Sequence, residues 1–349
     1  MHMNPLASCL LRRLAAVRFK KTGRPLLAGL AAVALLGSLP APAHALSAMA
    51  MKALCTEPAK GTGKADEAAK QALAGDAAFE LRKDEAKARE AVAAYEASLA
   101  ADANQPELRI KLVRVLYLLA DGYYRLAEKE DEMLDAFERG VTNAGAALQQ
   151  VNPSFRRKIC SGGPIPEAIA TLDRASVAPM YWFATHVGKY GLAKDLLEVL
   201  ANKDMIFAAM DALKRLNPSY YYHAPDRYLG GYYTKVPFPK GDLPTAFQHF
   251  RLSMKGSPNY LATYNLVAEM YAPRVIGLIA PKSERCVVDS PKLAEAGKYH
   301  PCRAFFEKLL RHVLDAKPEI LPDLAPEQAV EQEKAKKLLA EIDTFFPPL

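Results

Sequence analysis

Apolar residues recur every three or four positions along most of the chain after residue 64, and this spacing leaves little besides α-helix. An amphipathic helix needs an apolar stripe with a 3.6-residue period, whereas a half-buried strand needs strict alternation. Three clear stripes comprise Leu108, Leu112, Val115, Leu116, Leu119 and Tyr123, then Phe305, Phe306, Leu309, Leu310, Val313 and Leu314, then Ala335, Leu338, Leu339, Ile342 and Phe345. Alternating runs are scarce, so the sequence predicts an all-α fold.

Prolines stand at the starts of these helices rather than inside them. A proline in the first turn loses no helical hydrogen bond, because the first N–H groups have no partner there. The prolines that stand just before a stripe are Pro106, Pro166, Pro258, Pro301 and Pro326. Two segments do not fit this pattern: we expect an irregular loop over 152–166 and a long insertion over 273–301.

One stretch carries a repeat motif. Ala246, Phe250, Ser253 and Pro258 have the spacing of the second half of a tetratricopeptide repeat, and Leu229-Gly230 with Tyr233 fits the first half. In that motif small residues let two helices approach closely while aromatic rings fill the gap between them. Weaker hairpins are expected over 107–151, 176–216 and 259–316. The prediction is tetratricopeptide-like stacked helical hairpins, with a generic all-α bundle as the alternative.

The first 45 residues have the order of an export signal. The chain of 349 residues has a formal charge of +7, but residues 1–45 hold six Lys and Arg and no Asp or Glu. The remainder has 40 basic against 39 acidic residues, a net +1, which gives no electrostatic reason to bind nucleic acid. A fourteen-residue uncharged run, Leu26–Leu39, precedes small residues at Ala43 and Ala45. We interpret 1–45 as a cleaved signal peptide, with a retained anchor as the alternative.

We expect the mature protein to be periplasmic, with a linker over 46–64 and a single helical-repeat domain over 65–346. No convincing lipobox precedes a cysteine. Export makes disulfides plausible for the four remaining cysteines. We favour Cys286–Cys302 and Cys55–Cys160, with buried thiols as the alternative and a metal site as a remote one.

No catalytic or cofactor motif is present. The sequence lacks H-E-x-x-H, G-x-S-x-G and G-x-G-x-x-G, and Gly61-Thr62-Gly63-Lys64 is an incomplete phosphate loop. We therefore predict that the protein is not an enzyme and holds neither a cofactor nor a metal.

Tyrosine stands out instead. Six of the 16 tyrosines lie within residues 220–233, and Tyr260, Tyr264 and Tyr271 follow on what we expect to be one helical stripe. A tyrosine offers a large apolar ring with one polar group. These rings either form the repeat core or line a ligand channel. The candidate ligand-binding residues are Tyr222, His223, Arg227, Tyr232, Tyr260, Tyr264 and Asn265. Arg227 has Asp226, Asp242 and Glu269 as alternative partners.

The run from Tyr222 to Tyr233 resembles the TatT family, the T components of tripartite ATP-independent periplasmic (TRAP) transporters. The similarity continues through Gly241-Asp242-Leu243, His249-Phe250 and Glu269-Met270-Tyr271. It is specific over 217–316 and extends more weakly over 65–343. The resemblance implies a cavity through each protomer, a homotrimer, hydrophobic or amphipathic small-molecule ligands, and docking of a periplasmic substrate-binding protein.

Two functions remain open at this point. In the first, the protein is an accessory of a TRAP-type system and passes a small ligand through an aromatic-lined cavity. In the second, it is a periplasmic scaffold whose helical repeats bind another protein without a small ligand. An exported enzyme of an unfamiliar type is a weaker third alternative.

Overall fold

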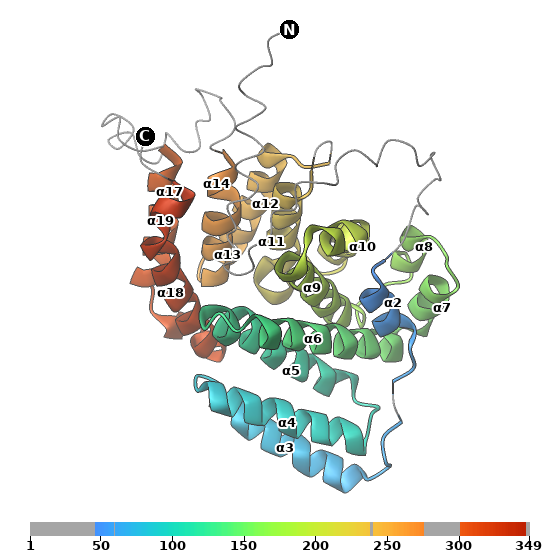
Figure 1. The fold of residues 1–349 in the computed structure, drawn as a ribbon. Helices are drawn as coiled ribbons and strands as arrows, with labels where there is room; N and C mark the ends of the chain where they lie inside the picture. The colour runs from blue at the N-terminus through green and yellow to red at the C-terminus, as the bar shows by residue number, and fades with distance from the viewer. Residues whose placement is uncertain (1–45, 59, 238–239, 276–300, 347–349) are drawn as a thin grey trace, which may run out of the picture. The chain divides into compact units, whose positions relative to one another are not determined.

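The computed structural model describes residues 46–58, 60–237, 240–275 and 301–346, and every regular element within these ranges is a helix (Figure 1). The prediction of an all-α fold is confirmed. The predicted signal peptide and most of the 273–301 insertion lie outside the described residues. Over the same ranges, no helix combines the length and apolar character that crossing a bilayer requires.

The helices follow one another with short connections. The first set is α2 (Ala48–Cys55), α3 (Ala65–Glu80), α4 (Glu85–Ala101), α5 (Pro106–Tyr117), η1 (Leu118–Tyr124), α6 (Glu130–Val151), α7 (Pro153–Cys160) and α8 (Ile165–Ile169). The second set is α9 (Val177–Lys194), α10 (Leu196–Leu216), α11 (Tyr220–Lys235), α12 (Leu243–Gly256), α13 (Leu261–Leu266), η2 (Val267–Tyr271) and α14 (Ala272–Val275). The last set is α17 (Pro301–Asp315), η3 (Pro318–Ile320), η4 (Pro322–Leu324), α18 (Ala325–Ala340) and α19 (Ile342–Phe345).

Consecutive helices pack as hairpins, and each hairpin packs on the next. The pairs are α3 with α4, α5 with α6, α9 with α10, and α11 with α12. The hairpins expected over 107–151 and 176–216 are therefore present. Helix α18 packs against η1, and the buried Arg82 after α3 pairs with Glu327 of α18 through Nε and Oε1 at 2.9 Å. Helix α18 thus contacts two of the first hairpins.

Glycine and an aromatic ring hold two of the hairpins together at close range. A Cβ added to Gly230 of α11 would lie 2.6 Å from Cδ1 of Phe250 in α12. A Cβ added to Gly75 of α3 would lie 2.4 Å from Cδ1 of Tyr95 in α4. Such distances leave no room for a methyl group. Both hairpins therefore use the packing that the repeat motif predicts.

Two segments near the N-terminus differ from expectation. The loop expected over 152–166 is wrong for residues 153–160, which form α7, because Asn152 caps the helix by accepting from the backbone N–H of Phe155 at 2.9 Å. Phe155 and Ile159 then bury one face of that helix. Residues 48–55 lie in the expected linker but form α2, with Leu54 fully buried.

A disulfide joins these two helices. Cys55 at the end of α2 is bonded to Cys160 at the end of α7, one of the two pairs that the sequence favours. It closes a loop across a sequence separation of 105 residues. Cys302 is buried in α17, whereas Cys286 lies outside the described residues, so the second pair stays a prediction.

Candidate functional site

A cavity of about 210 Å³ lies among the hairpins. Its walls come from α5 and η1, from α9 and α10, from α11, from α13 and η2, and from α18. One water molecule needs about 10–15 Å³ by this measure, so the cavity has room for a small organic molecule. Helices far apart in the sequence must pack correctly to form it.

Two of these walls contain π-helical turns. Residues 118–124 form η1 at the end of α5, and residues 267–271 form η2 at the end of α13. Such wide turns are rare and often occur at functional sites, where they re-aim side chains. Here η1 carries Asp121, and η2 carries Glu269, both of which line the cavity.

Five tyrosines contribute aromatic rings to the cavity lining. These are Tyr117, Tyr181, Tyr228, Tyr232 and Tyr260. The rings of Tyr181 and Tyr228 meet edge to face with centroids 5.7 Å apart, a favourable geometry for aromatic pairs. Burial raises the pKa of Tyr117, Tyr228 and Tyr260 well above the ordinary value. Their hydroxyl groups therefore remain protonated at neutral pH.

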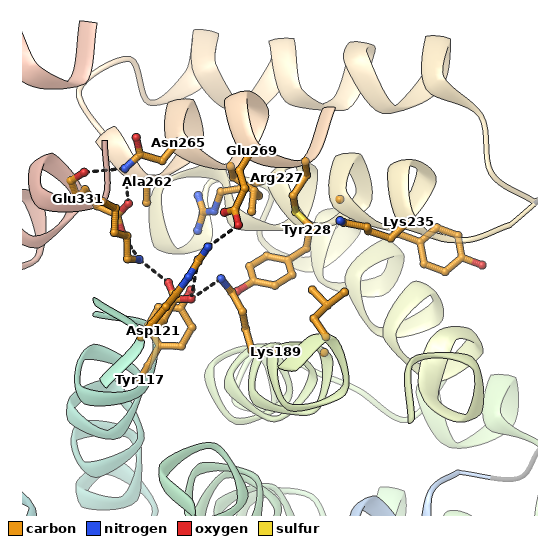
Figure 2. Close-up of a pocket in the computed structure, with 18 of the residues that line it drawn as sticks. Tyr117, Asp121, Lys189, Arg227, Tyr228, Lys235, Ala262, Asn265, Glu269 and Glu331 are labelled. Carbon is orange, nitrogen blue, oxygen red and sulfur yellow. Dashed lines mark hydrogen bonds and ion pairs between the residues drawn. The ribbon is translucent and has the colours of Figure 1, made fainter. Parts of the chain in front are cut away.

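A buried carboxylate with several cations forms another part of the lining. Figure 2 shows Asp121 between Lys189 and a chain of polar groups that leads to Glu331 and Asn265. The Nζ atoms of Lys189 and Lys334 each lie 2.6 Å from an oxygen of Asp121. Burial alone would raise the pKa of Asp121, but these two lysines outweigh it and hold the pKa well below the ordinary value.

The charge network extends across the cavity to η2. Arg125, which follows η1, pairs closely with Glu269 and lies 3.6 Å from Asp121. Lys334 also donates to Glu331 at 2.8 Å, and Glu331 accepts from Nδ2 of Asn265 at 2.7 Å. Each of these three carboxylates therefore has a cation beside it.

Two cations on α11 have no such partner. Arg227 is only 3% exposed, and no ion pair to it is found among the described residues. Its guanidinium donates to the backbone oxygens of Tyr222 at 3.0 Å and Tyr221 at 3.3 Å, and its Cζ lies 4.5 Å from the ring centre of Tyr260. Lys235 has neither a hydrogen bond nor an ion pair within those residues, and burial lowers its pKa. Both positive charges face the cavity.

The balance of charge in the cavity is therefore positive. The residues that line it include seven Lys and Arg against four Asp and Glu, and even without Lys203 and Lys337, which pair with Asp204 and Glu128 outside the lining, the cations outnumber the carboxylates. Buried charge is costly unless it is paired. This excess gives the cavity a chemical preference for a negatively charged group.

The structure separates the seven candidate ligand-binding residues into two sets. Four of them line the cavity: Arg227, Tyr232, Tyr260 and Asn265. Three do not line it: Tyr222, His223 and Tyr264. The hydroxyl of Tyr264 donates to the Pro258 carbonyl at 3.0 Å, and its ring packs on His312. Ligand contact by any of the seven stays a prediction.

The expected partners of Arg227 and the expected tyrosine stripe are not observed. Asp226 instead pairs with Lys214 and His249, Asp242 caps α12, and Glu269 pairs with Arg125. Tyr260 faces the cavity, while Tyr271 is buried against Phe247 and Phe250. The stripe breaks because Tyr260 precedes α13 and because the π turn η2 shifts the register before Tyr271.

Sequence reasoning missed most of the charged lining. The missed residues are Asp121, Arg125, Lys189, Lys235, Glu331 and Lys334. Lys235 could have been found, because residues 227, 231 and 235 are four apart and share a face of one helix. The others come from η1 and the residue that follows it, from α9 and from α18, so no local spacing points to them.

Comparison with known proteins supports the earlier resemblance. The family model described as TRAP transporter T-component matches residues 134–275, from within α6 to the end of α14. No curated protein matches the sequence. The family is a component of transport systems rather than a class of enzymes, which supports an accessory role in TRAP transport. Residues 134–275, which include Arg227, Lys235 and Glu269, are thus similar to the TRAP transporter T-component family.

Proposed function

We propose that this protein is a periplasmic accessory of a TRAP-type transport system that binds a small amphipathic ligand in the cavity. The ligand carries an anionic head and an apolar tail, and a substrate-binding protein docks on the T component to exchange it. By resemblance to the family, we also propose a homotrimer. Sedimentation of the purified mature chain tests the trimer.

The unpaired cations carry the proposal. An anionic head between Arg227 and Lys235 would compensate charges for which no carboxylate is found in the described part of the chain. Charge-assisted hydrogen bonds are stronger than neutral ones, and more so where water is excluded. The tail would meet the apolar part of the lining, which includes Ile206, Leu266, Met270 and Leu338.

Calorimetric titration with octanoate and with octan-1-ol tests this function. The two probes have the same chain length and differ in charge. We expect octanoate to bind at least about tenfold more tightly, as one charge-assisted hydrogen bond would give. Native mass spectrometry of the purified protein should also show a co-purifying small molecule. If neither probe binds and no molecule co-purifies, the cavity is not a ligand site.

Matched lysine variants locate the binding site within the cavity. Lys235→Met removes an unpaired cation, whereas Lys337→Met removes a rim lysine that already pairs with Glu128 at 2.7 Å. We expect Lys235→Met to weaken octanoate binding about tenfold and Lys337→Met to change it less than about threefold. If the two variants weaken octanoate binding equally, the anionic head does not bind specifically at Lys235.

Three exposed leucines favour docking of a protein partner beside the cavity. Leu192, Leu196 and Leu197 at the corner of α9 and α10 are 46%, 60% and 76% exposed, and Leu192 also lines the cavity. Clustered exposed apolar residues commonly mark interaction sites. The scaffold function, in which no small ligand takes part, rests on this same patch.

The double variant Leu196→Asp/Leu197→Asp separates the two functions. We expect it to lose capture of a TRAP substrate-binding protein while octanoate binding stays unchanged. If a partner protein is captured through these leucines but the wild-type chain binds no small molecule, the scaffold function is correct.

A further inference from the structure

The start of α11 has an unusual backbone. Tyr221, Tyr222 and His223 have φ values of 43°, 60° and 54°, and ψ values of 58°, 53° and 40°. These angles describe a left-handed helical turn, in which the Cβ of an L-residue approaches the following carbonyl. A single bulky residue with positive φ is already an outlier. Three in succession require surrounding contacts that enforce the turn.

Such contacts hold all three residues. Nδ1 of His223 lies 2.8 Å from Oγ of Ser257, the residue that ends α12. The His223 ring also covers Gly256, where an added Cβ would lie 2.4 Å from ring atoms. The ring of Tyr222 stacks on Tyr260 with centroids 4.9 Å apart and an interplanar angle of 4°, and Tyr221 packs edge to face on Trp182.

The turn aims two carbonyl groups at one side chain. The backbone oxygens of Tyr221 and Tyr222 both accept from the Arg227 guanidinium. In a right-handed helix the Tyr221 oxygen would need the N–H of residue 225, but Pro225 has none. Arg227 supplies the donor that Pro225 lacks. The turn therefore fixes the position of the guanidinium in the cavity wall without neutralising its charge.

A carboxylate in place of these carbonyls would hold Arg227 equally well but would cancel its charge. A flexible loop would leave the charge intact but its position undefined. The left-handed turn avoids both outcomes, since backbone oxygens are neutral acceptors with a fixed geometry. Positioning a charged guanidinium is therefore a role for the strained conformation that packing alone does not explain.

We propose that His223 is a positioning residue of the ligand cavity, acting through the left-handed turn 221–223 to hold the Arg227 guanidinium where it meets an anionic head. The inference rests on the proposed ligand-binding function. His223 and Ser257 lie outside the cavity lining, so any effect they have on a ligand must pass through the turn.

Binding selectivity tests this role. The measured quantity is the ratio of the dissociation constants of octan-1-ol and octanoate. We expect His223→Ala to weaken octanoate binding about tenfold and to leave octan-1-ol binding within about threefold, because the guanidinium loses its position while the apolar walls remain. His223→Asn should restore selectivity, because asparagine tolerates positive φ and can bond to Ser257.

Two further variants keep the test decisive. Ser257→Ala removes the same hydrogen bond without changing a turn residue, and it should reduce the ratio in the same direction. Tyr264→Phe removes a hydrogen bond to a backbone carbonyl outside both the cavity and the turn, and it should leave the ratio unchanged.

The possible outcomes are distinguishable. If the wild-type chain binds octanoate selectively but His223→Ala and Ser257→Ala keep the full ratio, the positioning role is wrong while the ligand function stands. A parallel loss of both probes in these variants would also overturn it, because a general loss of structure would explain that result. If the wild-type chain binds neither probe, the ligand function itself fails.

Discussion

The two sides of the cavity treat buried positive charge in opposite ways. On the side of η1 and α18, Lys189 and Lys334 each lie 2.6 Å from the same carboxylate, that of Asp121. On the side of α11, Arg227 and Lys235 have no carboxylate partner in the described part of the chain. The lysines on the side of η1 and α18 are already neutralised by a carboxylate of the protein, and we infer that this side stabilises the fold. The cations on the side of α11 lack an anionic partner, which a ligand can supply.

The residues of the two sides also differ in where they lie in the sequence. Arg227 and Lys235 both lie inside the region that the family model matches, whereas on the paired side only Lys189 does, and Asp121 and Lys334 lie before and after it. The chain thus builds its cavity by joining a matched segment to flanking helices. If the flanks only support the cavity, changing their charges should affect stability more than ligand selectivity.

The largest effect is expected from Asp121→Asn. This change leaves Lys189 and Lys334 buried beside a neutral amide, and breaking a buried ion pair in this way typically costs about 3–5 kcal/mol. Urea denaturation followed by circular dichroism should show that loss in the free energy of unfolding. A loss below about 1 kcal/mol would mean that the paired side does not depend on its carboxylate.

The same carboxylate predicts a dependence on acid. The folded-state pKa of Asp121 is depressed, so its contribution is fully present above the unfolded-state pKa of about 3.9 and is lost as pH falls through the folded-state value. The difference in free energy of unfolding between wild type and Asp121→Asn should stay constant from pH 7 to 5. This difference should become smaller only below about pH 4. If the difference vanishes near neutral pH, the stabilisation does not come from the Asp121 carboxylate.

Local chemistry explains which parts of this molecule the sequence could predict. The α11–α12 hairpin was predicted because Gly230 and Phe250 meet through fixed spacings within one repeat. Helix α7 was missed because Pro153 and the Gly162-Gly163-Pro164 run after the helix resemble a loop, although Asn152-Pro153 is a good helix start. Helix α2 was missed because its packing against α6 and α7 involves residues about a hundred positions away.

The residues of the site also divide into those that the local sequence could predict and those that it could not. Four of seven predicted ligand residues line the cavity because they lie on α11 and on or directly before α13, within the segment rich in tyrosine. Asp121 and Lys334 are separated by 213 positions, and only the return of α18 to η1 brings them together. His223 was predicted to touch the ligand but lies outside the cavity lining, because the left-handed turn directs its ring toward Ser257.

Alanine substitutions at two adjacent glycines of α11 test which face of that helix borders open space. Their expected effects on the free energy of unfolding are smaller than that of Asp121→Asn. Gly230 faces Phe250 at a distance that excludes a methyl group, whereas a Cβ on Gly231 would meet only Met270 Sδ at 3.9 Å. We expect Gly230→Ala to destabilise the fold by about 1–3 kcal/mol through overpacking. Gly231→Ala should be neutral or stabilise it by up to about 1 kcal/mol, because alanine favours helix. Thermal denaturation of both variants measures the difference.

Gly231→Leu extends that test to the cavity. Its longer side chain should fill the space between Arg227 and Lys235 and exclude octanoate without removing either charge. Equal stability of Gly230→Ala and Gly231→Ala would mean that Gly231 is packed as tightly as its neighbour and that the wall of α11 is closed.

The smallest effect on stability is expected from Lys235→Met. Because Lys235 lacks a partner, its replacement removes a desolvated charge and keeps the apolar stem, so the free energy of unfolding should change by less than about 1 kcal/mol at neutral pH. Lys334→Met, which strips Asp121 and Glu331 of a shared cation, should destabilise the fold by about 3 kcal/mol or more.

The folded-state pKa of Lys235 is lowered by burial, so charged Lys235 opposes folding at neutral pH. That penalty is relieved as pH rises through the folded-state pKa toward the unfolded value of about 10.4. Wild type should therefore gain stability relative to Lys235→Met on going from pH 7 to pH 10. If the two lysine variants instead lose equal stability, Lys235 has a partner in the native protein, and the difference between the two sides of the cavity disappears.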